Sequence, residues 1–279
     1  MITKMTLCQR FKYAQIAFVA FLSLTLLGFC LLFAEALPRA VDYDQVFIPA
    51  ALSAWRTGNP YVQGFYNPPW AILPLMPLAL LPEAWGKMAL IVMGLLSIAY
   101  VTKKLGGSPM AVGLILLSPP VLHGALNGNI DWLVALGFVL PPQIGLFFLV
   151  IKPQVGGVLA LYYAMRAWRE RRFIWTVGPV AVALLLSFLV YGFWPARAFV
   201  LPARSWNCSL WPYLIPVGLA LIVATFRKCE ARYVMPASLC LSPYVMFHSW
   251  VVGLLALSEH TLELAAAVIG LWILVAMRA

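Results

Sequence analysis

Charged side chains are scarce in this sequence, and acidic ones are the scarcest. Only 10% of the 279 residues are charged, with nine Asp or Glu against nineteen Lys or Arg. A chain that is 63% hydrophobic, with a mean hydropathy of +0.92, lies outside the range of soluble globular domains. Apolar runs long enough to cross a hydrocarbon core of about 30 Å recur along the whole chain. The composition therefore predicts a single integral membrane domain over residues 1–279.

Metal-binding and redox patterns are also lacking. The cysteines show no short paired spacing, and the three histidines do not have the spacing of metal ligands. We interpret the cysteines as buried thiols: Cys8, Cys30, Cys208, Cys229 and Cys240. The net charge of +10 comes from short basic clusters between apolar runs, which indicates membrane topology and lipid headgroups rather than nucleic acid. No internal repeat is present at a fixed period, which disfavours an inverted-repeat transporter.

The N-terminus begins with basic residues and continues into an apolar run. Lys4, Arg10 and Lys12 precede residues 13–34, a run too long for the core of a secretory signal. We therefore expect an uncleaved first span at 13–36 with a cytoplasmic N-terminus. Later apolar segments lie at 85–102, 108–123, from Gln154 to about 165, and at 174–194, 212–226, 233–256 and 262–277. Together they predict an all-α, polytopic helix bundle of about ten crossings with both termini in the cytoplasm.

Two proline-broken intervals leave the topology open. Residues 69–82 contain four prolines in fourteen positions, so they form either a span or a re-entrant, half-buried segment. Residues 132–151 are interrupted at Pro141-Pro142 and form either one kinked span or two short helices. We favour the re-entrant segment with two short helices, because that topology places Asp131 and most other acidic residues on the external side.

Residues 38–70 form the longest polar-containing interval of the chain. Asp42 and Asp44 lie near its start, directly after the first apolar span. Apolar residues from Phe47 to Trp55 then recur at helical spacing, which predicts a short amphipathic helix along the membrane interface that Gly58-Asn59-Pro60 ends. This placement predicts chemistry at the membrane face.

The motifs of this interval resemble those of a known family. The segments are Asp42-Tyr43-Asp44-Gln45-Val46-Phe47, Gly58-Asn59-Pro60-Tyr61, Phe65-Tyr66-Asn67-Pro68-Pro69-Trp70, Leu126-Asn127-Gly128-Asn129-Ile130-Asp131 and Ile151-Lys152-Pro153-Gln154. In order and spacing they resemble the membrane glycosyltransferases of the GT-C class, most closely the GT87 (DUF2029) branch, which use polyprenyl-phosphate sugars. The resemblance covers about residues 10–172, and residues 173–279 add C-terminal spans that are similar mainly in hydropathy.

The resemblance implies a fold, a reaction and partners. It implies a GT-C-like bundle in a bacterial plasma (inner) membrane that moves a hexose or pentose from a polyprenyl-phosphate donor to a lipid or glycan acceptor at the outer face. Asp42 matches the catalytic acidic residue of the family best, and Asp44 is the second candidate. An inverting transfer needs a carboxylate to take the proton of the acceptor hydroxyl, while cations or a metal neutralise the leaving phosphate. Both carboxylates also fit a simpler role, in which they solvate a loop or cap the following helix.

Six other residues are candidates for substrate binding around the donor: Asn129, Asp131, Lys152, Arg197, Arg204 and His248. A carboxylate at position 131, flanked by apolar runs, needs a cavity, an ion or a partner, and pairing with Lys152 is its simplest role. Lys152, Arg197 and Arg204 fit either a phosphate or lipid headgroups. His248 fits a cavity-facing residue or a satisfied core histidine. No cofactor is firmly implied, although a divalent cation held by Asp42 and Asp131 stays open.

Two other classes of function stay open beside the enzyme. The short chain and its many aromatic residues fit a non-catalytic subunit that keeps a GT-C-like fold and packs in a larger membrane complex. A lipid or solute transporter is the third alternative. A wide cavity lined by Asp42, Asp131 and Lys152 would favour the enzyme, whereas protein packing around these residues would favour the subunit.

Overall fold

The computed structural model describes residues 38–200, 206–228 and 230–278, together with the isolated positions 21, 24, 25, 28 and 32. Over these residues every regular element is a helix, in agreement with the predicted all-α class. The expected first span at 13–36, apart from its isolated described positions, lies outside the described part of the chain, as do Arg204, Cys8, Cys30 and Cys229.

The polar interval folds into short helices and loops. A π-helical turn, η2 (Tyr43–Phe47), leads directly into α2 (Ile48–Thr57). Gly58 ends α2 in the left-handed conformation with φ of 73°, which confirms the predicted stop. Residues 69–82 contain only η3 (Pro69–Ile72) and α3 (Met76–Ala79), neither long enough to cross a membrane.

The middle of the chain is one long helix followed by four short ones. The elements are α4 (Glu83–Lys104), α5 (Pro109–Leu116), α6 (Pro119–Asn127), α7 (Asp131–Leu136) and α8 (Pro142–Leu149). Prolines open α5, α6 and α8, because proline lacks the backbone N–H and disfavours helix in the residue before it, whereas Gly128 separates α6 from α7. Thus the run expected at 108–123 bends by 56° between α5 and α6. The run at 132–151 is two short helices, as the favoured alternative had it.

The C-terminal part follows with α9 (Pro153–Arg169), α10 (Phe173–Tyr191), η4 (Trp194–Val200), α11 (Ile215–Lys228), η6 (Ala231–Tyr233), α12 (Val234–Leu241), η7 (Phe247–Trp250), α13 (Val251–Leu255) and α14 (Thr261–Ala276). The prediction of one continuous span at 233–256 is wrong. Its helix α12 ends at Leu241, before Ser242-Pro243, and the chain resumes helical structure only at η7.

Two helices are long and apolar enough to cross a membrane, α4 and α10, and the bent pair α5 and α6 adds a third if it is counted as one span. This count applies to the described residues. The expected ten crossings are therefore not confirmed, because most apolar runs fold into helices shorter than a bilayer requires.

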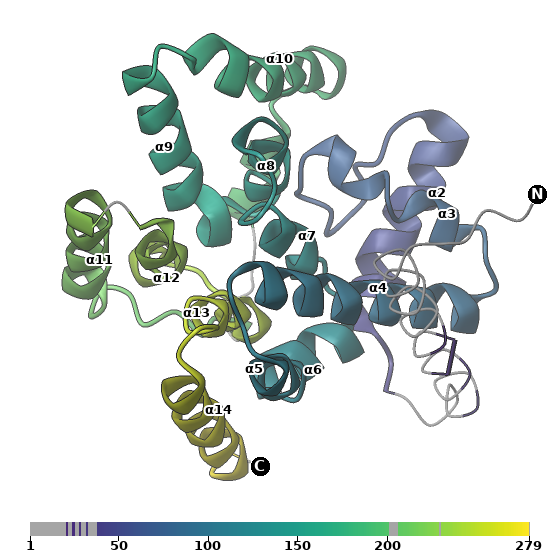
Figure 1. Cartoon of the computed structure of the whole chain (residues 1–279). Coiled ribbons are helices and arrows are strands. Elements are labelled where there is room, and N and C mark those ends of the chain that lie inside the picture. The colour runs from purple at the N-terminus through teal and green to yellow at the C-terminus, as the bar shows by residue number, and fades with distance from the viewer. Residues whose placement is uncertain are drawn as a thin grey trace, which may run out of the picture.

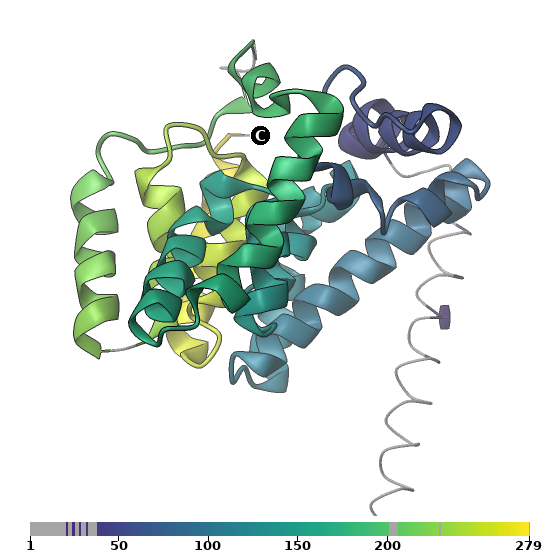
Figure 2. The same ribbon diagram turned by 90° about the horizontal axis from the view of Figure 1, so that it is seen from above.

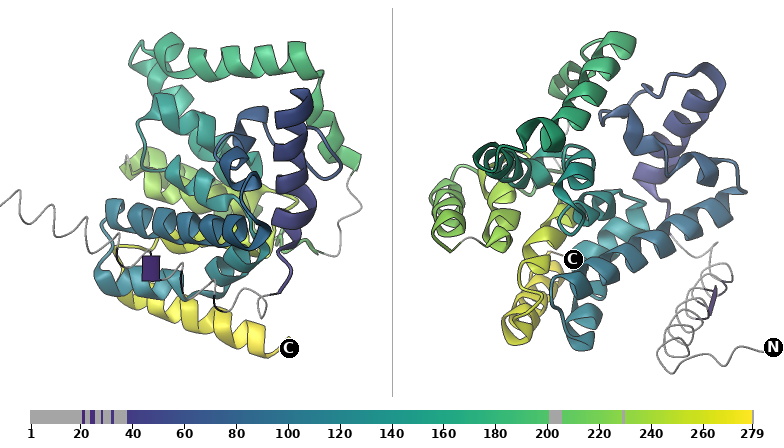
Figure 3. Two further views of the ribbon diagram at one scale, coloured as in Figure 1. Left: turned by 90° about the vertical axis from the view of Figure 1, so that its right-hand side faces the viewer. Right: turned by 45° about the horizontal axis from the view of Figure 1, so that its top comes forward.

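The helices pack in groups that meet in the interior of the protein. Helices α8, α9 and α10 lie together at one end, whereas α4, α5 and α6 form a second group (Figure 1). Helix α12 packs between α9 and α11, and α11 lies at the outer edge (Figure 2). Helix α14 runs along the outside of the second group (Figure 3). The short helices α6 and α7 and the turn η7 thereby meet in the interior, where the polar side chains gather.

Candidate functional site

Asp42 is held by two amide side chains from a distant turn. The Nδ2 groups of Asn127 and Asn129 both donate to its Oδ2, at 2.8 and 2.5 Å. Because both bonds end on the same oxygen, Oδ1 has no hydrogen bond within the described part of the chain and is the carboxylate oxygen left for another donor. Hydrogen bonds to a charged acceptor are stronger than neutral ones, so this pair fixes the orientation of the carboxylate.

Gly128 makes this arrangement possible. It ends α6 with φ of 71°, and the N–H of Asn129 bonds back to the carbonyl of Gly124 in a Schellman-type cap. The turn directs both flanking asparagines towards Asp42. A Cβ at position 128 would lie 2.4 Å from the Cβ of Tyr43, the residue next to Asp42, so only glycine fits.

We predict that Gly128→Ala lowers the free energy of unfolding by about 2–4 kcal/mol, since it combines left-handed strain with a clash against a buried side chain. Chemical denaturation in detergent micelles measures this change. Gly113→Ala is the matched control, because it lies within α5 with open space around it and should be neutral or stabilising. Equal effects of the two substitutions would contradict the assigned role of Gly128.

A buried ion pair lies behind the asparagines. Lys152 Nζ is 2.5 Å from Asp131 Oδ1, and the two residues are only 6% and 5% exposed. The same ammonium group donates to Asn129 Oδ1 at 2.6 Å. Asn129 therefore links Asp42 to Lys152, since its amide nitrogen serves the carboxylate and its oxygen accepts from the cation.

Local sequence explains why Lys152 points inward. The following Pro153 disfavours helical conformation at Lys152, whose φ of −133° and ψ of 89° separate α8 from α9. The first loop closes over this junction: Asn67 Nδ2 donates to the carbonyl of Ile151 at 2.9 Å, and Trp70 Nε1 donates to that of Phe147 at 2.9 Å. The loop motif and the Lys-Pro motif, 84 residues apart, are thus one structural unit.

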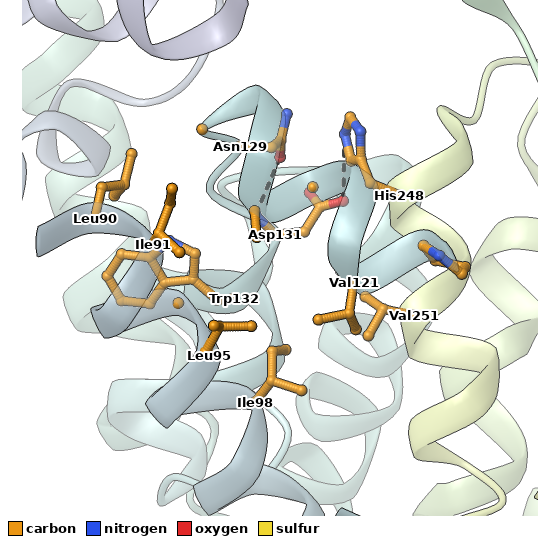
Figure 4. Close-up of a pocket in the computed structure, with 15 residues that line it drawn as sticks. Leu90, Ile91, Leu95, Ile98, Val121, Asn129, Asp131, Trp132, His248 and Val251 are labelled. Carbon is orange, nitrogen blue, oxygen red and sulfur yellow. Dashed lines mark hydrogen bonds and ion pairs between the residues drawn. The ribbon is translucent and has the colours of Figure 1, made fainter. Parts of the chain in front are cut away.

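The second oxygen of Asp131 contacts the C-terminal part of the chain. Ser249 Oγ donates to Asp131 Oδ2 at 2.8 Å. His248 Nε2 lies 3.5 Å from the same oxygen (Figure 4). The His248 ring is 1% exposed, has no hydrogen-bond partner on either nitrogen among the described residues, and stacks on His123 with ring centres 5.6 Å apart. His248 thus lies buried in the core beside the carboxylate of Asp131.

A small cavity borders this network. Its volume is about 40 Å³, enough for a few water molecules but too small for a sugar. Apolar side chains of α4, α6 and α13 line most of it, and Asn129, Asp131 and His248 supply its polar wall (Figure 4). Water in this cavity would satisfy the buried ring nitrogens of His248.

Burial makes Asp42 a stronger proton acceptor than a free aspartate. Loss of hydration raises the pKa of its carboxyl above the ordinary 3.8, and the negative charge of Asp131 acts in the same direction. The ammonium of Lys152, the amide of Asn129 and the nearby His123 partly oppose this rise. A raised pKa and one free oxygen are what a general base requires.

The donor set does not fit the divalent cation that the sequence left open. Among the described residues, no three Asp, Glu, His or Cys side chains converge on one point. Asp131 is already neutralised by the Lys152 ammonium, and Asp42 Oδ2 accepts from two amides. A divalent ion would have to displace these partners.

Two of the remaining predicted residues, Asp44 and Arg197, lie outside this network. Asp44 Oδ2 accepts from the backbone N–H of Ala40 at 3.1 Å, the local loop role weighed for it above. Arg197 is exposed, and its guanidinium lies 5.0 Å from the ring centre of Tyr61 and 3.4 Å from the Tyr61 carbonyl. Arg204 falls outside the described residues.

Sequence reasoning did not select Asn127 or Ser249 as site residues, although Asn127 lies in the motif at 126–131. Each is a neutral residue within two positions of a predicted one, and most candidates were selected by their charge. The signal that could have found Asn127 is the repeat of asparagine on both sides of a glycine, which places two amides at one tight turn.

Comparisons with known proteins do not assign this chain to a family, so only its fold and its site describe it. No protein-family model, curated protein or solved structure matches the chain. The described residues define an all-helical protein with candidate membrane spans and a buried network of carboxylate, amide, ammonium and imidazole groups.

Proposed function

We propose that this protein is a membrane glycosyltransferase that moves a sugar from a polyprenyl-phosphate donor to a lipid or glycan acceptor, with Asp42 as the general base. The observation that carries the proposal is the clamp on Asp42, whose Oδ2 takes two amide N–H groups while Oδ1 remains for an acceptor hydroxyl. The raised pKa of this carboxyl supports the same role. We place the reaction at the outer face of a bacterial plasma membrane, as the resemblance of the loop motifs implies.

In the proposed reaction the acceptor hydroxyl oxygen attacks the anomeric carbon of the donor. The bond from that carbon to the phosphate oxygen breaks, and its electron pair stays on the polyprenyl phosphate. The hydroxyl proton passes to Asp42 Oδ1, and the configuration at the anomeric carbon inverts. Lys152 is already neutralised by Asp131, so its role is to hold Asn129, whereas the exposed Arg197 is a cation available to the leaving phosphate.

A second candidate function is a non-catalytic subunit of a membrane complex. The cavity beside the network is too small for a sugar, and large side chains such as Trp175 and Tyr213 are 77% and 86% exposed. Such side chains serve packing against either lipid or another membrane protein. This candidate predicts that Asp42 and its partners act only in packing.

Mass spectrometry of lipids bound to the purified chain, followed by a transfer assay, tests the proposal. We expect a polyprenyl phosphate or its sugar derivative to co-purify, and we expect added polyprenyl-phosphate hexose or pentose to be consumed when a lipid acceptor extract is present. A chain that binds no polyprenyl lipid and consumes no donor would contradict the enzyme. Co-purification of a stoichiometric membrane protein in the same preparation would then support the subunit.

A further inference from the structure

The turn between α9 and α10 concentrates positive charge at the end of a candidate membrane span. Residues 166–172 contain four arginines and one acidic residue, Glu170, which pairs with Arg166 at 2.8 Å. The other three arginines are exposed and have no carboxylate within ion-pair distance among the described residues: Arg169, Arg171 and Arg172. Because α10 begins at Phe173 and is long and apolar enough to cross a membrane, the turn lies at the level of the lipid headgroups.

A second basic segment lies beside this turn. Helix α11 ends in Arg227 and Lys228, and both side chains are exposed. The guanidinium of Arg169 lies 5.5 Å from the ring centre of Phe226, so two segments that are distant in the sequence meet at one place. Together they form a basic patch of five side chains: Arg169, Arg171, Arg172, Arg227 and Lys228.

Exposed tryptophans flank the basic patch. Trp168 is 71% exposed and Trp175 is 77% exposed, and Trp168 packs edge to face against Phe173 with ring centres 5.4 Å apart. Tryptophan next to arginine at the end of an apolar helix is typical of the membrane interface, where the indole ring lies among the headgroups. The position of the patch therefore favours the surface of a lipid leaflet as its partner over a soluble acidic molecule.

Arg171 has a backbone conformation that favours glycine. Its φ is 55°, in the left-handed region where a side chain is strained. The turn is a Schellman-type cap, in which the N–H of Arg172 donates to the carbonyl of Ala167 at 2.8 Å. The last turn of α9 already has Arg166 and Arg169 as cations for the helix dipole. The fold therefore does not require an arginine at position 171, and what this residue adds to the turn is an exposed positive charge.

We propose that the basic patch binds the headgroup of an anionic phospholipid, with guanidinium groups from the α9–α10 turn and from α11 around its phosphate. Guanidinium groups donate paired N–H bonds to phosphate oxygens. A zwitterionic lipid offers the same phosphate but adds a cation, which the patch repels. The site is independent of the proposed sugar transfer, because it lies about 25 Å along α9 from Lys152.

Native mass spectrometry of the full chain in detergent micelles tests this site with dioleoyl phosphatidylglycerol and dioleoyl phosphatidylcholine. We expect the first bound phosphatidylglycerol to have an affinity about tenfold higher than phosphatidylcholine. Arg171→Gly should weaken phosphatidylglycerol binding about fivefold and leave phosphatidylcholine binding unchanged, because it removes one charge near the headgroup. Its melting temperature should not fall, since glycine adopts a φ of 55° without strain.

Two further variants complete the experiment. Arg227→Gln removes a charge from the α11 side of the patch and should weaken phosphatidylglycerol binding to the same extent. Arg56→Gln is the matched control, because it removes an exposed arginine of α2, outside the patch, and should leave the affinity for both lipids unchanged.

The outcomes separate this site from a general effect of charge and from the proposed enzyme. Equal affinities for the two lipids, or an equal loss in Arg56→Gln, would overturn the site. Unchanged binding in both Arg171→Gly and Arg227→Gln would place the anionic lipid elsewhere on the protein and would overturn it too. Displacement of the lipid by an equal concentration of glycerol 3-phosphate would overturn the lipid as the ligand, because the patch would then hold a soluble phosphate. Sugar transfer enters none of these measurements, so their failure leaves the role of Asp42 untouched.

Discussion

Asp42→Asn is expected to lower the rate of sugar transfer by about 10²–10⁴-fold, because it removes the only group proposed to take the acceptor proton. Asparagine has the shape of aspartate, and its side-chain oxygen can still accept from Asn127 and Asn129, so the fold should persist. The measurement is release of polyprenyl phosphate by purified protein, with thermal unfolding as the check on folding. Retained sugar transfer in a folded variant would contradict the role of Asp42 as the general base.

Asp44→Asn is the matched control for this experiment. Both residues lie in the same helical turn, but the carboxylate of Asp44 accepts from the backbone N–H of Ala40 and lies outside the amide clamp. We expect its transfer rate to stay within a few-fold of the unmodified protein. Loss of transfer in Asp44→Asn with retention in Asp42→Asn would exchange their roles.

The pH dependence of transfer follows from the environment of Asp42. Burial raises the pKa of its carboxyl above 3.8, so the base becomes active only as the pH rises through that higher value. The same shift makes the protonated form favourable in the folded state, so this carboxyl stabilises the fold below pH 3.8 and that stability is lost as the pH rises through the folded pKa. The amide of Asn129 lowers the pKa, and its removal should move the acidic limb of the rate profile to higher pH.

The fold was predictable where it depends on hydrophobic length and on proline. Apolar runs located α4, α10 and α14, and the dipeptide Pro141-Pro142 indicated the break between α7 and α8. What the runs could not show is how many of them end early. The break after Leu241 falls at Ser242-Pro243, but these two residues lower the local hydropathy too little to end the apolar run at 233–256.

The site was predictable for its charged residues but not for their geometry. Asp131 and Lys152 stand out because an ionised group in an apolar run needs a partner, and the structure pairs them with each other. The contact of Asp131 with Ser249 joins residues 118 positions apart, a separation at which one sequence carries no pairing information. The amide clamp on Asp42 is likewise a product of the left-handed turn at Gly128, which only the folded chain places beside Tyr43.

Lys152→Met is expected to destabilise the protein by about 3–5 kcal/mol, because it leaves the buried carboxylate of Asp131 without its cation. The measurement is the free energy of unfolding from chemical denaturation in detergent micelles. Arg166→Met is the matched control: its ion pair with Glu170 is exposed, so its loss should leave the free energy of unfolding nearly unchanged. If the two substitutions lowered the free energy of unfolding by similar amounts, Lys152→Met would not leave a buried, unpaired charge on Asp131.

The double variant Lys152→Met with Asp131→Asn separates the charge from the packing. Removing both charges leaves no unpaired ion, so the double variant should be more stable than Lys152→Met alone. Together with the single variant Asp131→Asn, it gives the coupling energy between the two groups. Transfer should not recover with stability, however, because the ammonium also holds Asn129 Oδ1 at 2.6 Å and through it the carboxylate of Asp42. Recovery of both stability and transfer would mean that the ion pair supports only the fold. Recovery of stability without transfer would mean that Lys152 helps to orient the carboxylate of Asp42.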